Sequence, residues 1–468
     1  MSHSRLRGFS NQCACPKVGA GLKPAPTDGS DACQEPHLTE CIAVSLRYVL
    51  AGLVLVLVGV FCSTVEAKLL IDVEHPSVEP MKIVVPDFTC GPGGQVSGRE
   101  LADILRNDLF LTGLFHVMET PPSAVDPTRG EPDFQTLSQT GAQALILGSV
   151  TFRGDEMTLE GRVYDVALRK MELGKRFSGK ARDHRAMVHK FGDRILEALT
   201  GTPGCFSTRI AFVSATQERE IYVMDFDGHN LHRVTQTGSI NLSPEWSPDG
   251  RSILFTSYQT GKSDLWFVDL PSRRQGIVSG RAGINASAKY SPDGQQIALS
   301  MNDQGIPKVF LITTEGNIIK RLTSGRGNDI SPTWSPDRST IAYVSDQAGT
   351  PQIYMIPVNG GQAKRLTFET NYSTDPDWSP RGDLLAFTAR IEGRFQICTI
   401  RTDGTGFKVL TEKGSNQAPA WSPDGRMIAF SSRRDGTHRI YVMDVRGTVQ
   451  APVSPIPGKA PAWSSTSQ

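Results

Sequence analysis

The sequence predicts a mixed architecture in which a small α/β domain precedes an all-β, six-bladed propeller closed by a C-terminal strand. Two observations support the propeller, namely a motif repeated every 42 to 44 residues and an incomplete copy of it at each end of 205–464. A third observation supports the α/β domain: 81–204 lack this repeat and alternate strand-like with helix-like segments.

Each repeat contains an aromatic residue followed by Ser-Pro-Asp-Gly or a variant of it. The aromatic residues are Trp246, Tyr290, Trp334, Trp378, Trp421 and Trp463. Pro sets φ and Gly accepts positive φ, so the tetrapeptide is expected to form a tight turn. Strands of the types Ile-Ala-Phe-x-Ser and Ile-Tyr-Val-Met-Asp follow, and a short Arg-x-Leu-Thr strand ends the unit. Four strands linked by turns predict one antiparallel propeller blade.

The two ends of the repeat region predict how the ring closes. The first unit starts with Ile-Ala-Phe-Val-Ser at 210–214 and lacks a Pro-x-Trp strand, whereas the last unit ends on Pro-Ala-Trp at 461–463. Pairing of 460–464 with 209–214 would complete one blade. Closure of this kind removes exposed sheet edges, so we expect the C-terminal strand to belong to the first blade.

The region 81–204 predicts a small mixed sheet with helices. The expected strands are 82–88, 115–118, 144–151, 157–166 and 170–179. Ser97 is expected to cap a helix with an apolar face, a short helix is expected near 132–139, and an amphipathic helix over 184–199 is expected to end at Gly201.

The N-terminal part predicts export from the cytoplasm. Arg47 precedes an apolar run over 48–62, and Val-Glu-Ala at 65–67 offers small residues for cleavage, so 47–67 is interpreted as a signal peptide. An uncleaved anchor and a lipoprotein box at Cys62 are the alternatives. The extension 1–46 stays unassigned and is consistent with an upstream choice of start codon. The polar stretch 68–80 is expected to be a mobile segment at the mature N-terminus.

Charge and cysteine content limit the classes of function. Lys and Arg total 49 against 48 Asp and Glu, which gives no electrostatic case for binding nucleic acid. Cys90, Cys205 and Cys398 remain after cleavage, and both a Cys90–Cys205 bridge and three unpaired thiols stay open. The histidines lack metal-ligand spacing and the turn aspartates suit turn chemistry, so neither a metal site nor a cofactor is expected, and a cation in the channel stays open.

The junction 199–214, together with Gly148, Tyr164-Asp165, His189 and Asp193, resembles the TolB family of the Tol-Pal system, and the resemblance covers about 68–464. It implies a periplasmic protein whose propeller binds the lipoprotein Pal and whose mature N-terminal segment binds TolA. It also implies a role in outer-membrane integrity and in envelope constriction at cell division. We expect no membrane insertion after signal cleavage, and a monomer in the absence of partners.

The loops that lead into the Pro-x-Trp strands are expected to gather on one propeller face. They carry Asn241, Asn285, Asn328, Asn371 and Asn416. These side chains either form a ring of donors and acceptors for a partner or only favour the turn conformation. Neighbours that differ between units, and are therefore expected to set specificity, are Arg281, Ile284, Asp329, Ile330, Tyr372 and Thr374. The resemblance implies that this face meets Pal.

The segment 68–80 has two interpretations. An extended peptide can bind by adding a strand to the sheet edge of a partner. The resemblance supports this for TolA, with Leu70, Ile71 and Val73 as expected contacts. The alternative is a disordered leader.

Two other classes of function were considered. An enzyme of the prolyl-peptidase type would need Gly-x-Ser-x-Gly on a separate domain, and the sequence contains no such motif. The protein is therefore expected not to be an enzyme. A generic periplasmic propeller scaffold that binds another lipoprotein or a peptide remains the alternative.

Overall fold

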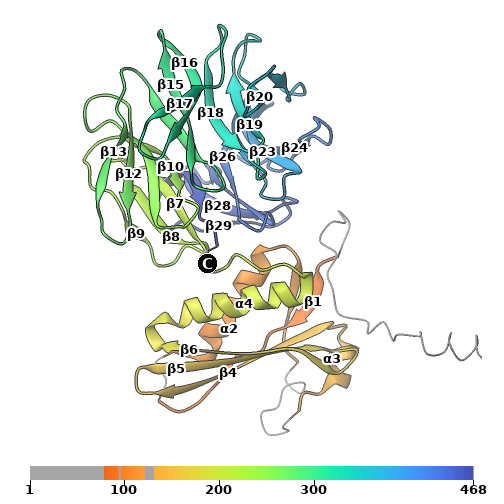
Figure 1. Ribbon diagram of the computed structural model, residues 1–468. Coiled ribbons are helices and arrows are strands. Elements are labelled where there is room, and N and C mark those ends of the chain that lie inside the picture. Colours follow the sequence, from red (N-terminus) through yellow and green to blue (C-terminus); the bar gives the residue numbers. More distant parts are fainter. Residues whose placement is uncertain (1–78, 94–95, 122–130, 467–468) are drawn as a thin grey trace, which may run out of the picture. The chain divides into compact units, whose positions relative to one another are not determined.

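The computed structural model describes residues 79–93, 96–121 and 131–466. Within them, a small α/β domain is followed by six four-stranded antiparallel sheets, which confirms the predicted fold class (Figure 1). The extension, the signal peptide and most of the N-terminal segment lie outside the described residues, and so do Leu70, Ile71 and Val73.

The α/β domain contains a six-stranded sheet with the order β3-β1-β4-β5-β6, and β2 pairs with β4. The strands are β1 (Met81–Val84), β2 (Thr89–Cys90), β3 (Phe115–Met118), β4 (Ala144–Arg153), β5 (Glu156–Asp165) and β6 (Lys170–Lys180). The strand expected over 82–88 ends at Val84, and β2 starts only at Thr89. Pro86 lies between them and lacks the N–H that a continuous ladder requires.

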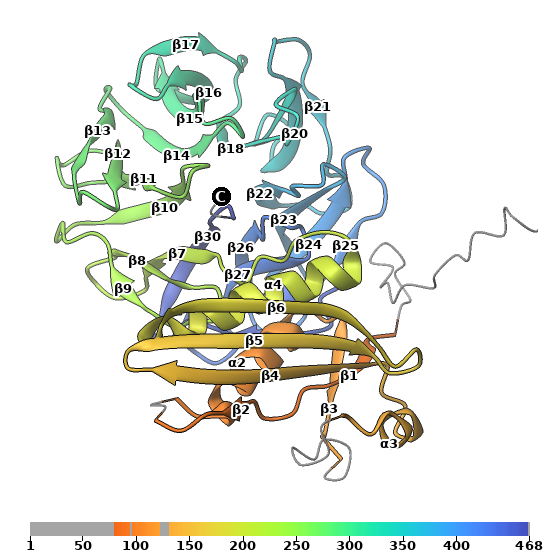
Figure 2. The ribbon, with the colours of Figure 1, turned by 60° about the horizontal axis from the view of Figure 1, so that its bottom comes forward.

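Helices cover both faces of this sheet. The helices α2 (Gly98–Leu111) and α4 (His184–Thr200) pack on one face, and α3 (Phe134–Gln139) packs near β1 and β4 on the other (Figure 2). A 3-10 turn, η1 (Ala181–Asp183), precedes α4. Ser97 caps α2 as expected, because its Oγ accepts a hydrogen bond from Glu100 N at 3.1 Å. Gly201 ends α4 at a φ of 77°, a left-handed conformation that glycine tolerates.

The propeller has six blades, numbered here in chain order. Blade 1 contains β7 (Arg209–Ser214), β8 (Ile221–Asp225), β9 (His232–Arg233) and β30 (Gly458–Trp463). Blade 2 contains β10 (Asn241–Trp246), β11 (Ser252–Ser257), β12 (Asp264–Asp269) and β13 (Gln275–Ser279). Blade 3 contains β14 (Asn285–Tyr290), β15 (Gln296–Asp303), β16 (Ile306–Thr313) and β17 (Ile318–Arg321).

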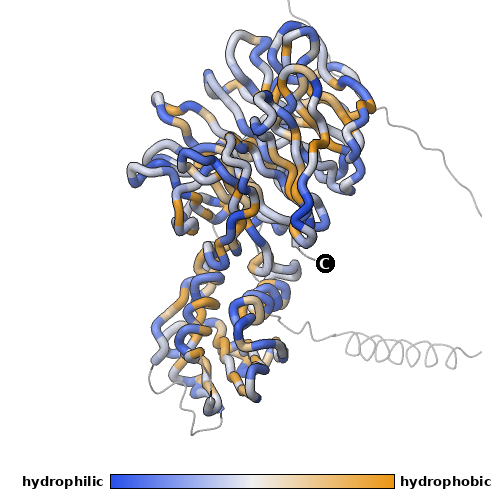
Figure 3. Tube along the Cα trace, turned by 90° about the vertical axis from the view of Figure 1, so that its left-hand side faces the viewer, coloured by the Kyte–Doolittle hydropathy of each residue, from blue (hydrophilic) through white to orange (hydrophobic). Residues whose placement is uncertain are grey.

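Blades 4 to 6 repeat this order. Blade 4 contains β18 (Asp329–Trp334), β19 (Thr340–Ser345), β20 (Gln352–Pro357) and β21 (Lys364–Arg365). Blade 5 contains β22 (Ser373–Trp378), β23 (Leu384–Ile391), β24 (Arg394–Arg401) and β25 (Lys408–Val409). Blade 6 contains β26 (Asn416–Trp421), β27 (Met427–Ser432), β28 (Arg439–Asp444) and β29 (Gln450–Pro452). Figure 3 shows hydrophobic residues along the strands and hydrophilic residues in many turns.

The C-terminal strand closes the ring as predicted. β30 is antiparallel to β7, with Gly458 opposite Ser214 and Trp463 opposite Ile210. Trp463 Nε1 donates a hydrogen bond to Thr208 Oγ1 at 2.7 Å. The inner position of blade 1 is therefore filled from the far end of the chain.

Each inner strand starts earlier than the Pro-x-Trp pattern suggests and contains a β-bulge. The bulge residues have φ values between 49° and 54°, and they are Ser243, Ser287, Ser331, Asp375, Ala418 and Ala460. A left-handed conformation costs a residue other than glycine about 1–2 kcal/mol, so neighbouring contacts must hold it. Two bulges are held from the preceding blade, since Ser331 N donates to Ser300 Oγ and Ala418 N donates to Thr388 Oγ1.

The alternation of strand directions creates two propeller faces. The Asn face carries the loops that lead into the inner strands and the turns between the second and third strands of each blade. The turn face carries the Ser-Pro-Asp-Gly-type turns and the turns between the third and fourth strands. Figure 2 shows the inner strands arranged around the propeller centre.

The α/β domain contacts the turn face. Arg426, which is buried on a blade 6 turn, donates to Thr200 Oγ1 at 2.6 Å and to Pro203 O at 3.0 Å. Arg446 of the β28–β29 turn donates to Gly113 O at 2.5 Å. These turns are thereby tied to the ends of α2 and α4, and the Asn face lies at the other end of the strands.

A buried cluster of ionisable side chains lies at the same contact. His189 Nδ1 on α4 is 2.7 Å from Asp108 Oδ2 on α2, and His189 Nε2 is 3.7 Å from Asp227 Oδ2 on the propeller. Arg185 forms an ion pair with Asp227. Burial raises the pKa of Asp108 to about 7. Burial disfavours the charged ring of His189, but the attraction of Asp108, the hydrogen bond to it and the attraction of Asp227 together outweigh burial and raise the His189 pKa.

The first prediction concerns ring closure. A protein that lacks 458–468 should lose at least about 3 kcal/mol of unfolding free energy, because the buried Trp463 and the whole of β30 are removed. Chemical denaturation measures the difference. Removal of 466–468 alone is the matched control and should have little effect. Equal stability of the two truncated proteins would contradict a role of β30 in closure.

The second prediction concerns pH. Raised folded-state pKa values mean that the folded protein binds more protons than the unfolded chain. The contribution of Asp108 is therefore present at low pH and is lost as pH rises to about 7, and that of His189 is lost as pH rises through its raised pKa. We expect the Tm of the wild type to decline between pH 5 and pH 8. D108N should reduce the corresponding loss of unfolding free energy by at least about 1 kcal/mol, because it removes the titrating carboxyl group and also the attraction that raises the His189 pKa. The exposed Glu119 provides the control variant E119Q. A pH dependence unchanged in D108N would refute this role.

Candidate partner-binding face of the propeller

The first residues of the inner strands are buried on the Asn face. These positions are occupied by Asn241, Asn285, Asp329, Ser373, Asn416 and Gly458. The side chains of Asn241, Asn285 and Asn416 are fully buried. Asn328 and Asn371, which precede the corresponding strand starts, are exposed. The repeated asparagines therefore do not occupy equivalent positions.

The buried members join neighbouring blades. Asn241 Nδ2 donates to Glu220 Oε2 of blade 1 at 3.0 Å, and Asn416 Nδ2 donates to Gln396 Oε1 of blade 5 at 2.8 Å. Asn285 Nδ2 donates to the carbonyl oxygen of Ser263 in blade 2 at 3.0 Å. Buried amides need such partners, because an unsatisfied amide costs about 1–3 kcal/mol.

Asp329 also joins two neighbouring blades. Its Oδ2 lies 2.8 Å from Lys308 Nζ of blade 3, and both side chains are buried. The predicted ring of exposed donors and acceptors is therefore not formed by Asn241, Asn285 and Asn416, and Asp329 is not exposed for a partner. The asparagine Nδ2 groups and the carboxylate of Asp329 are used in contacts between blades, whereas Asn241 Oδ1 is buried without a hydrogen-bond partner among the described residues.

The other predicted site residues remain accessible on this face. Arg281, Ile284, Asn328 and Asn371 are exposed, whereas Ile330, Tyr372 and Thr374 are half-buried. Asn328 Nδ2 donates to Asp346 Oδ2 at 2.6 Å, which orders its loop. Arg281 Nη2 donates to Gly316 O of the neighbouring blade at 3.3 Å. A binding role for this group stays a prediction.

Exposed apolar side chains on the Asn face were missed by the sequence reasoning, apart from Ile284. They lie in the inner-strand loops and in the turns beside them, and they are Ile240, Tyr258, Ile284, Ile306 and Phe368, between 36% and 67% exposed. Tyr258 N donates to Ile240 O at 3.0 Å, so these two loops touch. Apolar residues inside polar turns are the sequence signal that could have revealed them. Groups of exposed apolar residues mark interaction surfaces.

An arginine–aromatic cluster lies on the same face of blade 5. The Arg390 guanidinium carbon is 5.1 Å from the ring centre of Tyr372 and 5.3 Å from that of Phe395. The two rings are 5.8 Å apart. In blade 4, Arg365 lies 4.6 Å from the ring centre of the exposed Phe368. Tyr and Arg held in this way are typical of residues that dominate the energy of protein interfaces.

The central channel contains a cavity of about 120 Å³ lined by the six bulges. Lys289 Nζ is 2.8 Å from Glu245 Oε2 and 3.1 Å from Asp377 Oδ1, so one ammonium group lies between carboxylates of two other blades. Burial raises the pKa of Glu245 to about 7. Asp377 Oδ2 also accepts from Trp421 N at 2.8 Å. Lys289, Glu245 and Asp377 are thus used in contacts between blades, whereas Asp375 accepts a hydrogen bond from Thr374 of its own blade.

One group of side chains in the described part of the chain has the proximity that a metal ion requires. It comprises Asp108, His189 and Asp227 at the contact between the α/β domain and the propeller. Arg185 already pairs with Asp227, and His189 is already paired with Asp108. The arrangement therefore acts as an ion-pair network.

Thiols and membrane spans were also considered. Cys90, Cys205 and Cys398 are free, and the last two are buried. Across 79–93, 96–121 and 131–466, no helix combines the length and the apolar character needed to cross a membrane.

Known families match both parts of the chain. The TolB beta propeller domain family matches residues 196–467, and the TolB amino-terminal domain family matches 69–171. The crystal structure of TolB from Acinetobacter baumannii superposes with a TM-score of 0.75 at 25% identity, and the match covers 84% of this chain and 98% of that one.

Curated relatives carry the name Tol-Pal system protein TolB. The protein from Desulfosudis oleivorans is 37% identical over 216 residues, which is 44% of this chain and 49% of that protein. The one from Geobacter sulfurreducens is 43% identical over 159 residues, which is 33% of this chain and 37% of that protein. The chain thus spans half or less of the length of these relatives. Because the propeller family alone covers more than half of the chain, the chain belongs to the TolB family of Tol-Pal system proteins.

Proposed function

We propose that this protein is a non-enzymatic, periplasmic interaction component of the Tol-Pal system. In this proposal the Asn face binds the lipoprotein Pal, and the segment 68–80 binds TolA. The link supports outer-membrane integrity and the constriction of the envelope at cell division. Membership of the TolB family supports the Tol-Pal context, and the signal peptide expected over 47–67 supports the periplasmic location.

One observation carries the assignment of Pal to the Asn face. Exposed apolar side chains and the cluster around Arg390 gather there, whereas the turn face is engaged by the α/β domain. Loops on a rigid scaffold are common binding surfaces, because the scaffold removes the entropic cost of ordering them. The links beneath, such as Lys308–Asp329, hold these loops in place.

The predicted residues divide into two roles in this proposal. The accessible ones touch Pal directly, and they are Arg281, Ile284, Asn328, Ile330, Asn371, Tyr372 and Thr374. The buried ones, Asn241, Asn285, Asp329 and Asn416, position the loops from below. Substitution of the first group should therefore change affinity, whereas substitution of the second should also lower stability.

The TolA part rests on the resemblance and on the partly apolar sequence of 68–80. In an added strand, Ile71 and Val73 would lie on one face and Leu70 on the other, with the backbone supplying the hydrogen bonds. The two sites are independent in sequence, so they can be tested separately.

The third prediction tests the Asn face. I284D should weaken binding of the purified periplasmic part of Pal at least about tenfold, because a charge replaces an apolar contact in the interface. Isothermal titration calorimetry measures the affinity. I318D is the matched control, since Ile318 is an exposed isoleucine of the outer strand β17 away from the Asn face.

Three outcomes separate the possibilities for this test. Loss of affinity in I284D with normal affinity in I318D supports the Asn face. Equal affinities in both variants would contradict it. Failure of the wild type to bind Pal at micromolar concentration would remove the Pal function and favour a scaffold for another lipoprotein or peptide.

The fourth prediction tests the N-terminal segment. A protein that begins at Pro80 should no longer be captured by immobilised TolA, yet it should bind Pal with unchanged affinity. It retains Met81, whose backbone N–H bonds to Leu114 O at 2.8 Å at the start of β1. A full mature chain with L70D and I71D is the matched variant, and it should behave in the same way. Capture of the truncated protein by TolA would exclude this segment as the binding site.

A further inference from the structure

We propose that a pocket on the turn face, between blades 1 and 2, binds a small organic anion that carries a phosphate or carboxylate group. The pocket has a volume of about 410 Å³, which is in the range of small-molecule sites. It lies away from the Asn face, so it extends the proposed function and does not depend on it.

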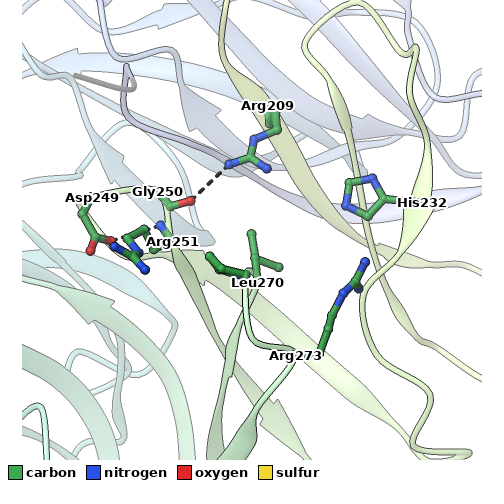
Figure 4. Close-up of a pocket in the computed structure, with 8 residues that line it drawn as sticks. Arg209, His232, Asp249, Gly250, Arg251, Leu270 and Arg273 are labelled. Carbon is green, nitrogen blue, oxygen red and sulfur yellow. Dashed lines mark hydrogen bonds between the residues drawn. The ribbon is translucent and has the colours of Figure 1, made fainter.

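Three arginines from different parts of the propeller line the pocket. Arg209 begins β7, Arg251 follows the Ser-Pro-Asp-Gly turn of blade 2, and Arg273 lies in the turn between β12 and β13. Figure 4 shows Arg209 and Arg273 on opposite sides of the pocket, with Arg251 and His232 also at its margin. Convergence of guanidinium groups is the usual means of binding phosphate and carboxylate.

Arg209 is held in position before any ligand arrives. Its Nη2 donates to Gly250 O at 3.1 Å, and its guanidinium carbon lies 4.8 Å from the ring centre of Trp246. These contacts use one N–H group and one face of the guanidinium, which leaves other donors available. Burial lowers the pKa of Arg209, yet an arginine side chain remains charged at neutral pH.

The propeller repeat shows that this arginine is not a framework residue. The equivalent first positions of the second strands carry Ser252, Gln296, Thr340, Leu384 and Met427. Five blades thus form the same strand without a charge there. A half-buried guanidinium is costly to desolvate, so its presence at one blade needs a specific reason.

Arg251 can be compared with its equivalent in blade 6. There, Arg426 is buried and donates to Thr200, Thr202 and Pro203 of the α/β domain. In blade 2 the same position faces the pocket, and Arg251 is exposed. Among the described residues, neither Arg209, Arg251 nor Arg273 forms an ion pair.

The described carboxylates near the pocket form no ion pair with its three arginines. The Oδ1 of Asp249 accepts from Ser247 Oγ at 2.5 Å and from Arg251 N at 3.1 Å, so it serves the turn. Asp225 attracts Arg209, and Arg251 attracts both Asp249 and Asp269, but none of these contacts is an ion pair. In the lining itself, three guanidinium groups face the single carboxylate of Asp249, so cationic groups outnumber anionic ones at the surface that a ligand would meet.

The apolar part of the pocket wall indicates which kind of anion would fit. Leu270 and Pro271 contribute apolar surface beside the arginines. A ligand with an anionic head and a short apolar part matches both features, whereas an inorganic anion would use only the first. Phenyl phosphate and phenylacetate are therefore suitable probes for the two head groups.

The fifth prediction tests this site in the mature protein by isothermal titration calorimetry at physiological ionic strength. The wild type should bind phenyl phosphate or phenylacetate saturably with one site, and more tightly than inorganic phosphate. The double variant R251Q/R273N should lose at least about tenfold in affinity, since two charge-assisted contacts are removed. Asparagine suits position 273, whose φ is 59°.

R274Q is the matched control. Arg274 neighbours Arg273 but lies 5.6 Å from the Phe267 ring centre and does not line the pocket. R274Q should retain wild-type affinity, and Pal binding should be unchanged in all variants, which separates this site from the Asn face. Absence of saturable binding by the wild type, or an equal loss of affinity in R274Q and R251Q/R273N, would overturn the proposal.

Discussion

The pairing of β30 with β7 is the constraint on which the propeller depends. It supplies the inner strand of blade 1 and also the first acceptor in a series of contacts between blades. Trp246 Nε1 donates to Ala462 O of β30 at 3.1 Å. Trp334 and Trp421 repeat this geometry on Lys289 O and Asp377 O. In every case the acceptor is the residue before the repeat aromatic of an adjacent blade. Three of the five repeat tryptophans therefore join neighbouring blades, whereas Trp378 Nε1 donates to Gly382 O of its own blade and Trp463 to Thr208. The contact of Trp246 requires that β30 closes the ring.

Closure gives the molecule two faces with different chemistry. On the Asn face, buried polar side chains such as Asn416 join blades while apolar side chains such as Phe368 stay exposed. On the turn face, Arg426 and Arg446 bond to the α/β domain. The proposed partner-binding surface lies on the first face. The arginine pocket indicates that the second face has a binding chemistry of its own.

Asparagines in the loops of neighbouring blades differ in burial, so they have different roles. Asn416 is fully buried and bonded to Gln396, whereas Asn371 is exposed in the loop before β22. The difference is one of register, since the strand starts at Asn416 in blade 6 but at Ser373 in blade 5. A buried amide contributes to stability only while its partner is present. In the proposed function, recognition is therefore assigned to residues that vary between blades.

The amino-acid sequence by itself determined the number of blades, their closure and the helix cap at Ser97, because these features follow from periodicity and local backbone chemistry. The tertiary structure decided which polar side chains are buried, and sequence spacing could not. Trp463 and Thr208, for example, are 255 residues apart in sequence. The bulges at Ser243 and its equivalents could not be predicted from the sequence either, since none of these residues is glycine, and at Ser331 and Ala418 a neighbouring blade holds the left-handed conformation. Contacts between distant segments set burial, charge balance and exposed surface, and on these the binding sites depend.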